Sequence, residues 1–357
     1  MVVGWEFDDM IQFGITASSL PSGTPGALFA VGYDSFKARA WRWLGSFIGA
    51  KYTDPFTTLL KDSRVVTTTS TNDAVIIGMQ SSPYLIAFPF DMSTGWGPIY
   101  PMTSPSVPSQ VIDISLTSND SDVAVAALGQ FPLVWTWISG SGFGTKYSDP
   151  ASIGLVSTTY GVSFSPANDV IIGVGDGSAP NDYLSAWAWS GSGFGVLKSG
   201  PSSPPSARAY SIAFANDGSA VAIGFTASPY LNVYAWSGGA FGAKFSNPST
   251  LITSTPLSVE FRPDNTAIAF GQEFFPYMGA YAWSGSGFGA KFANPSTLPS
   301  NYVSSVSFDS TGAYLATGNT STYYLTVYPF STSTAFGGTI RPPLAEQIVA
   351  QGVTFTK

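Results

Sequence analysis

A repeat of 47 residues is the feature that most constrains how this chain can fold. Its two best-preserved copies read YAWSGGAFGAKFSNPSTL from Tyr234 and YAWSGSGFGAKFANPSTL from Tyr281. The second aromatic residue of each copy marks the phase, and these residues are Trp43, Phe90, Trp137, Trp189, Trp236, Trp283 and Phe330. The steps between them are 47, 47, 52, 47, 47 and 47 residues. Seven copies at this spacing predict a β-propeller or a stacked array.

Each copy reads as four short strands. Alternating apolar pairs, such as Val259 with Phe261 and Val306 with Phe308, indicate a first strand. A turn rich in Asn, Asp and Gly follows, and these residues tolerate the backbone of a tight hairpin. A nearly continuous apolar segment, an aromatic segment that ends in Trp, and the F-G-x-K segment give the other three strands. Because no segment shows a helical period, we expect an all-β chain.

Four strands per copy, repeated seven times, predict a seven-bladed β-propeller of antiparallel blades. The first copy lacks a matching first strand, because Ser22 stands where the Phe of that strand would be. The 25-residue step from Trp283 to Phe308 reaches Phe355 when it starts from Phe330. We therefore expect the C-terminal strand to complete the first blade and close a ring over residues 21–357.

Residues 1–20 lie outside the repeat and form an expected N-terminal arm. Within this arm the large apolar side chains alternate as they would in a short strand, and they are candidates for an anchor on the propeller or on a neighbour: Trp5, Phe7, Ile11 and Phe13. The sequence leaves both alternatives open.

The composition excludes several kinds of chemistry. The chain has no Cys and no His, so we expect no catalytic triad, no thiolate site and none of the usual zinc or iron sites. A net charge of −7 without a basic cluster argues against nucleic acid. No basic residue occurs in the first ten positions and no apolar run reaches the ~18 residues of a membrane helix, so we expect neither a secretory signal nor membrane insertion. The prediction is no catalytic residue, no cofactor and no metal.

The pattern V-x-F-x-x-D-G-x-x-x-A-x-G, followed by a strand that ends in Trp, resembles the repeats of WD40-type propellers across residues 21–357. The sequence departs from that family at two places. It has no Gly-His pair, and the Asp that follows the Trp is replaced by Leu44, Ile138, Ser190, Ser237 and Ser284. The form W-S-G-x-x-F-G-x-K-[FY]-x-[ND]-P is similar to WD40-like propellers in structural proteins of tailed phages.

One face of the ring is the candidate binding face. An aromatic residue lies six positions before the phase mark in six copies, at Tyr84, Phe131, Tyr183, Tyr230, Tyr277 and Tyr324. The loop that leaves the fourth strand carries an amide or carboxylate before Pro, at Asp54, Asp149, Asn247 and Asn294. Both loops emerge on the same face of an antiparallel blade, and together they suit sugars or a Tyr-rich protein interface. Alternatively, the rings wedge between blades and the prolines only stiffen the loops.

A recurring Lys in the fourth strand also has two interpretations. Lys51, Lys146, Lys244 and Lys291 could form a ring of positive charge for an acidic partner. They could equally protect the outer edge strand of each blade from pairing with another chain. The second interpretation is favoured.

These features predict a non-catalytic structural or interaction module rather than an enzyme. The resemblance implies a phage virion component, either a capsid decoration protein or a tail or host-attachment protein, located in the virion or at an extracellular surface. Its expected partners are other virion or surface proteins and glycans. The alternative is a multivalent, lectin-like glycan-binding propeller. A carboxylate-based glycoside hydrolase or lyase would need acidic residues that converge on the axis, and the uniformity of the copies argues against it.

Overall fold

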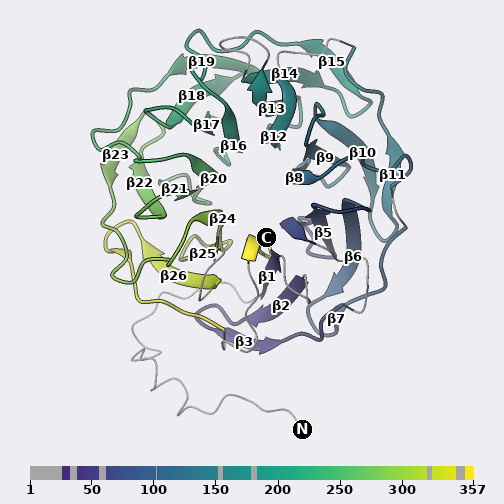
Figure 1. The fold of residues 1–357 in the computed structure, drawn as a ribbon, viewed down its shortest axis with the longest axis horizontal. Coiled ribbons are helices and arrows are strands. Elements are labelled where there is room, and N and C mark those ends of the chain that lie inside the picture. The colour runs from purple at the N-terminus through teal and green to yellow at the C-terminus, as the bar shows by residue number, and fades with distance from the viewer. Residues whose placement is uncertain are drawn as a thin grey trace.

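The strands of the computed structural model form seven sheets of four antiparallel strands, arranged as a ring around a central axis (Figure 1). The structure describes residues 26–32, 38–55, 62–101, 103–151, 156–177, 183–319, 324–342 and 350–357. This arrangement confirms the predicted fold class. The predicted arm, with Trp5, Phe7, Ile11 and Phe13, lies outside the described residues. Within them, no helix is long and apolar enough to cross a membrane.

The blades follow one another along the chain, and each runs from the axis to the rim. Blade 1 consists of β28 (Ala350–Phe355), β1 (Gly26–Gly32), β2 (Ala38–Trp43) and β3 (Ile48–Lys51). Blade 2 consists of β4 (Ser63–Thr68), β5 (Ala74–Met79), β6 (Leu85–Asp91) and β7 (Gly95–Trp96). Blade 3 consists of β8 (Val111–Leu116), β9 (Asp122–Ala127), β10 (Leu133–Ile138) and β11 (Gly142–Lys146). Blade 4 consists of β12 (Val156–Phe164), β13 (Val170–Gly177), β14 (Leu184–Trp189) and β15 (Phe194–Leu197). Blade 5 consists of β16 (Ala209–Phe214), β17 (Ala220–Phe225), β18 (Leu231–Ser237) and β19 (Ala240–Lys244). Blade 6 consists of β20 (Pro256–Phe261), β21 (Ala267–Gln272), β22 (Met278–Trp283) and β23 (Phe288–Lys291). Blade 7 consists of β24 (Val303–Phe308), β25 (Tyr314–Asn319), β26 (Leu325–Ser331) and β27 (Ala335–Phe336).

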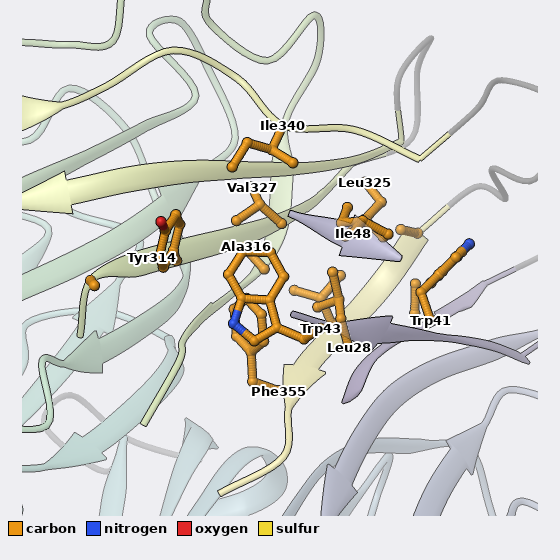
Figure 2. Close-up of a cluster of buried hydrophobic side chains, with 14 residues drawn as sticks. Leu28, Trp41, Trp43, Ile48, Tyr314, Ala316, Leu325, Val327, Ile340 and Phe355 are labelled. Carbon is orange, nitrogen blue, oxygen red and sulfur yellow. The ribbon is translucent and has the colours of Figure 1, made fainter. Parts of the chain in front are cut away.

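The last strand of the chain closes the ring, as the repeat spacing predicted. β28 pairs antiparallel with β1, so that Phe355 lies opposite Leu28 and Val353 lies opposite Ala30. Trp43 of β2 then packs against two neighbours, with ring centroids 5.2 Å from Phe355 and 4.8 Å from Tyr314 of blade 7 (Figure 2). The seam between the first and last blades is therefore a hydrophobic core built from both ends of the repeat array.

The second strand is buried along its whole length in five of the seven blades, in β5, β9, β17, β21 and β25. Such a strand contacts a neighbouring blade on both faces, which explains its nearly continuous apolar sequence. The strand-ending Trp residues fill the spaces between blades: Trp189 of blade 4 lies 5.0 Å from Tyr147, which follows blade 3, and Trp283 of blade 6 lies 5.0 Å from Phe245, which follows blade 5, measured between ring centroids. Aromatic pairs at these distances stabilise beyond the area they bury.

The first strands lie nearest the axis (Figure 1), and side chains join several of them directly to the next blade. Ser258 Oγ accepts a hydrogen bond from the backbone N–H of Val306 at 3.2 Å, and Ser305 Oγ accepts one from Val353 at 3.2 Å. These bonds satisfy edge N–H groups that no fifth strand can reach. They define the wall in which the candidate site lies.

Candidate active site on the propeller axis

Two chambers lie along the axis of the ring. The upper chamber has a volume of about 470 Å³ and is bounded by the beginnings of the first strands of all seven blades. The lower chamber has a volume of about 420 Å³ and lies towards the hairpin turns that follow the first strands. Asp113, Ile212 and Val259 line both chambers, so the two form one axial path. Volumes of this size are typical of small-molecule sites.

Asp113 of β8 is the carboxyl group placed between the chambers. Its Oδ2 accepts a hydrogen bond from the N–H of Val162 in blade 4 at 3.0 Å, and its Oδ1 accepts one from the N–H of Ile114 at 2.9 Å. Burial raises the pKa of Asp113 to about 7, although the two N–H groups favour its ionised form. A carboxyl group fixed in orientation and poised near neutral pH is suited to proton transfer.

Glu260 of β20 is the second carboxyl group that reaches the axis, and it lines the lower chamber. Its Oε2 accepts the N–H of Phe308 at 2.9 Å. Burial raises the pKa of Glu260 to about 8, against smaller opposing effects of that hydrogen bond and of Lys357. Acidic residues therefore do converge on the axis, contrary to the expectation drawn from the uniform repeats.

The aligned copies contain the signal that reveals both acids. Asp113 occupies the register position that is Ser211, Ser258 and Ser305 in blades 5, 6 and 7. Glu260 occupies the position that is Ser115, Ser163 and Ser307 in blades 3, 4 and 7. Departures of this kind mark a site better than the residues the copies share.

Arg64 of β4 provides positive charge in the upper chamber. Its side chain is half-buried, and no hydrogen bond or ion pair joins its guanidinium to any of the described residues. Gln351 of β28 lies on the neighbouring strand and is only 6% exposed. Its Nε2 atom is enclosed and has no hydrogen-bond partner in the described part of the chain. Both side chains line the same chamber with hydrogen-bonding capacity to spare.

An aromatic pair forms another part of the upper wall. The rings of Tyr160 in β12 and Tyr210 in β16 lie 4.8 Å apart between centroids. The guanidinium of Arg208 lies 5.6 Å from the Tyr160 centroid, and its Nε donates to the carboxylate of Asp176. Burial, followed by the charge of Asp176, raises the pKa of Tyr160, so the phenol stays neutral. This group is held rigidly, and its two formal charges cancel.

The six aromatic residues of the predicted binding face lie elsewhere. Five of them pack partly buried against the hydrophobic cores between blades: Tyr84, Tyr183, Tyr230, Tyr277 and Tyr324. Phe131 is partly buried in the loop before β10. None of the six lines the upper or the lower chamber. Their positions agree with the wedge interpretation, and the binding face built on them stays a prediction.

The polar residues predicted for that face are each bound by the Lys three positions earlier. Lys51 lies 2.7 Å from Asp54, Lys291 donates to Asn294 at 3.0 Å, and Lys244 donates to Asn247 at 2.5 Å. Lys146 pairs in the same way with Asp149. These contacts tie the outer strand of a blade to the loop that leaves it. They use the Lys side chains locally rather than as a free positive ring.

No group of three or more acidic residues that could hold a metal ion occurs within the described ranges. Among the described residues, the two chambers are lined by two carboxyl groups, the guanidinium of Arg64, three amides and several hydroxyls.

Comparison with known proteins identifies similar folds but no sequence family. No protein-family model and no curated protein matches the sequence. A candidate 6-phosphogluconolactonase from Bacteroides uniformis is similar in structure, with 13% identity and a TM-score of 0.69 over 93% of this chain and 99% of that one. The periplasmic gluconolactonase PpgL of Pseudomonas aeruginosa is similar at 13% identity and a TM-score of 0.68, over 94% and 99%. The β-propeller domain of Cps50 (Swd1) from Myceliophteria thermophila matches at 12% identity and a TM-score of 0.56, over 79% and 87%.

These findings correct the expected function. A non-catalytic phage module, and with it the expectation that the chain is not an enzyme, is contradicted by full-length neighbours that carry the names of lactone-hydrolysing enzymes. The similarity to phage structural propellers is not supported, and the expected partners and location are not tested. At these identities the comparisons establish the fold alone. The chain is a seven-bladed β-propeller, and its resemblance to WD40-like propellers holds at that level.

Proposed function

We propose that this protein hydrolyses sugar lactones in its upper chamber. One observation carries the proposal: a buried carboxyl group with a pKa of about 7, Asp113, shares a chamber with the guanidinium of Arg64, which has no partner among the described residues. Lactone hydrolysis needs a base to activate water and a fixed positive charge near the carbonyl oxygen. The names of the two lactonase-like neighbours support the substrate class.

The reaction follows from these two groups. Asp113 takes a proton from a water molecule as the water oxygen bonds to the carbonyl carbon of the lactone. The carbonyl π electrons move to the carbonyl oxygen, and Arg64 stabilises the resulting negative charge. The carbon–oxygen bond of the ring then breaks, and the leaving oxygen receives the proton from Asp113. The product is an open-chain hydroxy acid, and Asp113 returns to its ionised form.

The environment of Asp113 suits this role. A general base is most effective when its pKa is near the working pH, because it must be ionised and still bind a proton well. An exposed Asp is too weak a base, whereas burial raises the pKa of Asp113 to about 7. The N–H groups of Val162 and Ile114 hold the carboxyl group in place, so little reorganisation is needed during proton transfer.

The rest of the upper chamber fits a sugar ring. Tyr160 and Tyr210 present rigid aromatic rings, on which the apolar C–H face of a sugar can stack. Ser304 and Ser305 line the same space, and their hydroxyl oxygens, whose protons point to backbone carbonyls, can each accept a hydrogen bond from a sugar hydroxyl. The volume of about 470 Å³ is large enough for such a ligand.

A proton-release assay tests the proposal. The full chain should hydrolyse D-glucono-1,5-lactone or its 6-phosphate faster than buffer alone. The rate should rise with pH and level off above about 7, because Asp113 must be ionised. Arg64→Gln should lower kcat/KM by about 10²-fold or more, whereas Lys146→Gln, the same charge change on the outer edge of blade 3, should leave it unchanged. Rates equal to spontaneous hydrolysis for both lactones would rule the proposal out.

A further inference from the structure

The seam between blades 1 and 2 places two uncommitted side chains next to each other. Arg64 is a half-buried residue near the start of β4, and Gln351 precedes Gly352 in the neighbouring strand β28. A Cβ atom on Gly352 would lie 2.7 Å from the carbonyl oxygen of Arg64 and 2.9 Å from the Cα of Val65. The strands thus approach so closely that only Gly fits. This approach fixes the backbones that carry the guanidinium and the amide.

The polar groups of this seam lack acceptors. Arg64 has five N–H donors, and none of them is bound by the described residues. Gln351 is only 6% exposed, and its Nε2 atom has no hydrogen-bond partner among the described residues. Leaving a buried amide donor unpaired is unfavourable, because the group has given up its hydrogen bonds to water. Because both residues line the upper chamber, a ligand oxygen that reaches them would give both a hydrogen-bond partner.

The other charges that face the chamber limit the charge of that ligand. Arg208 is already bound to Asp176, so it adds no net positive charge. Asp113 faces the chamber from blade 3, and Glu260 faces the axial path from blade 6, where the charge of Lys357 offsets part of its own. Both carboxyl groups repel an anion when they are ionised. One unpaired guanidinium can therefore balance one negative charge, whereas a phosphate dianion would need a second free cation.

We propose that Arg64 and Gln351 bind the carboxylate of a sugar acid in the upper chamber. The planar guanidinium can bind a carboxylate through two parallel hydrogen bonds, and its single positive charge favours a singly charged carboxylate over a phosphate dianion here. The identity of the acid rests on the proposed function, because hydrolysis turns the lactone carbonyl next to Arg64 into a carboxylate. The protein is then inhibited by its own product, which competes with the lactone for the same two side chains.

Isothermal titration of the full chain with D-gluconate tests this site without any need for turnover. D-Gluconate should bind, and the uncharged analogue D-sorbitol should bind at least tenfold more weakly. Arg64→Gln should weaken gluconate binding by about 10- to 100-fold, because a charge-assisted bidentate contact is lost. Gln351→Glu should have a similar effect, because the new carboxylate would pair with Arg64 in place of the ligand. Lys146→Gln is the matched control for net charge.

The outcomes separate this inference from the proposed function. Gluconate binding that depends on Arg64 supports the carboxylate site even if no lactone is hydrolysed. Hydrolysis that proceeds without inhibition by gluconate overturns the carboxylate site and leaves the hydrolase intact. Equal affinity of the wild type and Arg64→Gln, or tighter binding of D-sorbitol than of D-gluconate, would also overturn it. Circular dichroism of each variant confirms that the propeller is folded.

Discussion

Two seams of the propeller make the same contact with different side chains. Between blades 3 and 4, the carboxylate of Asp113 accepts the N–H of Val162 at 3.0 Å. Between blades 6 and 7, the hydroxyl of Ser258 accepts the N–H of Val306 at 3.2 Å from the equivalent register position. Because a serine is sufficient to join two blades, the carboxyl group of Asp113 is not needed for that purpose. Burying it costs free energy that serine avoids.

Two residues further along the first strands, the same two seams exchange their types of acceptor. There the seam between blades 3 and 4 uses Ser115, which accepts the N–H of Phe164 at 3.1 Å, and the seam between blades 6 and 7 uses Glu260. Each seam thus has one hydroxyl and one carboxyl group, at opposite levels. The seam between blades 7 and 1 uses serine at both levels. The acids are additions to a serine pattern that already holds the ring together.

The largest effect should come from making the two seams alike. Asp113→Ser should lower the rate of lactone hydrolysis by about 10²- to 10⁴-fold, the usual loss on removing a general base. The variant should fold, because serine makes the same contact in blade 6. Steady-state kinetics and urea unfolding of the same preparation check both parts. Activity within threefold of the wild type would show that Asp113 is only a structural acceptor.

Ser258→Asp is the converse change, and it gives blade 6 the carboxyl group of blade 3. It should supply no extra activity, because no unpaired guanidinium faces that position from the adjacent strand in the described residues. Hydrolysis by the double variant Asp113→Ser, Ser258→Asp should stay at the level of Asp113→Ser. Recovery of the rate would mean that position along the wall matters less than the comparison implies.

The next effect concerns the seam between blades 1 and 2, where Gly352 holds the register position of Asp113. Gly352→Ala should destabilise the fold by about 2–3 kcal/mol, because the new Cβ would meet backbone atoms of β4 at 2.7 and 2.9 Å, and backbone cannot move aside cheaply. Urea unfolding should show a lower midpoint with an unchanged slope. Gly338→Ala is the control, since a Cβ there has no heavy atom within 4 Å and the backbone is not left-handed. Equal midpoints would contradict the close approach.

The sequence predicted the fold well because the fold depends on what the copies share. The 47-residue period, the apolar pairs of the first strands and the step from Phe330 to Phe355 each report a contact that recurs around the ring. The closing strand was predictable for the same reason, since Phe355 stands where Phe308 stands in blade 7. Residues 1–20 have no counterpart in the other copies, so the repeat says nothing about them.

The candidate site was missed because it consists of residues that the copies do not share. Asp113 and Glu260 replace serines, and Arg64 stands where the other blades have Ile112, Tyr160, Tyr210, Leu257, Ser304 and Gln351. The features that the copies share, the recurring tyrosines and the Asn-Pro or Asp-Pro loops, indicate a different site. The aromatic residues recur because they pack between blades, and the Asp and Asn residues recur because each contacts the Lys three positions earlier. Their burial depends on contacts between blades, which a single copy does not reveal.

The acids of these two seams should also make the stability of the fold depend on pH. The folded-state pKa of Asp113 is about 7 and that of Glu260 about 8, both above their unfolded values. The folded protein therefore holds more protons than the unfolded chain between about pH 4 and pH 8, and stability must fall as pH rises through that window. Unfolding free energy should be several kcal/mol lower at pH 8 than at pH 5, because both groups stay protonated in the fold over most of that range. Most of this dependence should vanish in the double variant Asp113→Ser, Glu260→Ser.

The smallest effect measures the seam bond by itself. Ser258→Ala removes the acceptor of the Val306 N–H without changing charge, and it should lower the unfolding free energy by about 1 kcal/mol, the usual net value of one hydrogen bond. Ser305→Ala should do the same at the next seam, because the bond to Val353 has the same length. The loss should be independent of pH between 5 and 8, since neither serine titrates, and this separates it from the effect of Asp113. If the two losses exceeded about 3 kcal/mol each, the hydroxyl groups would be essential to closing the ring. The acid in blade 3 would then be a stabilising bridge, and its role in catalysis would have to be argued from kinetics alone.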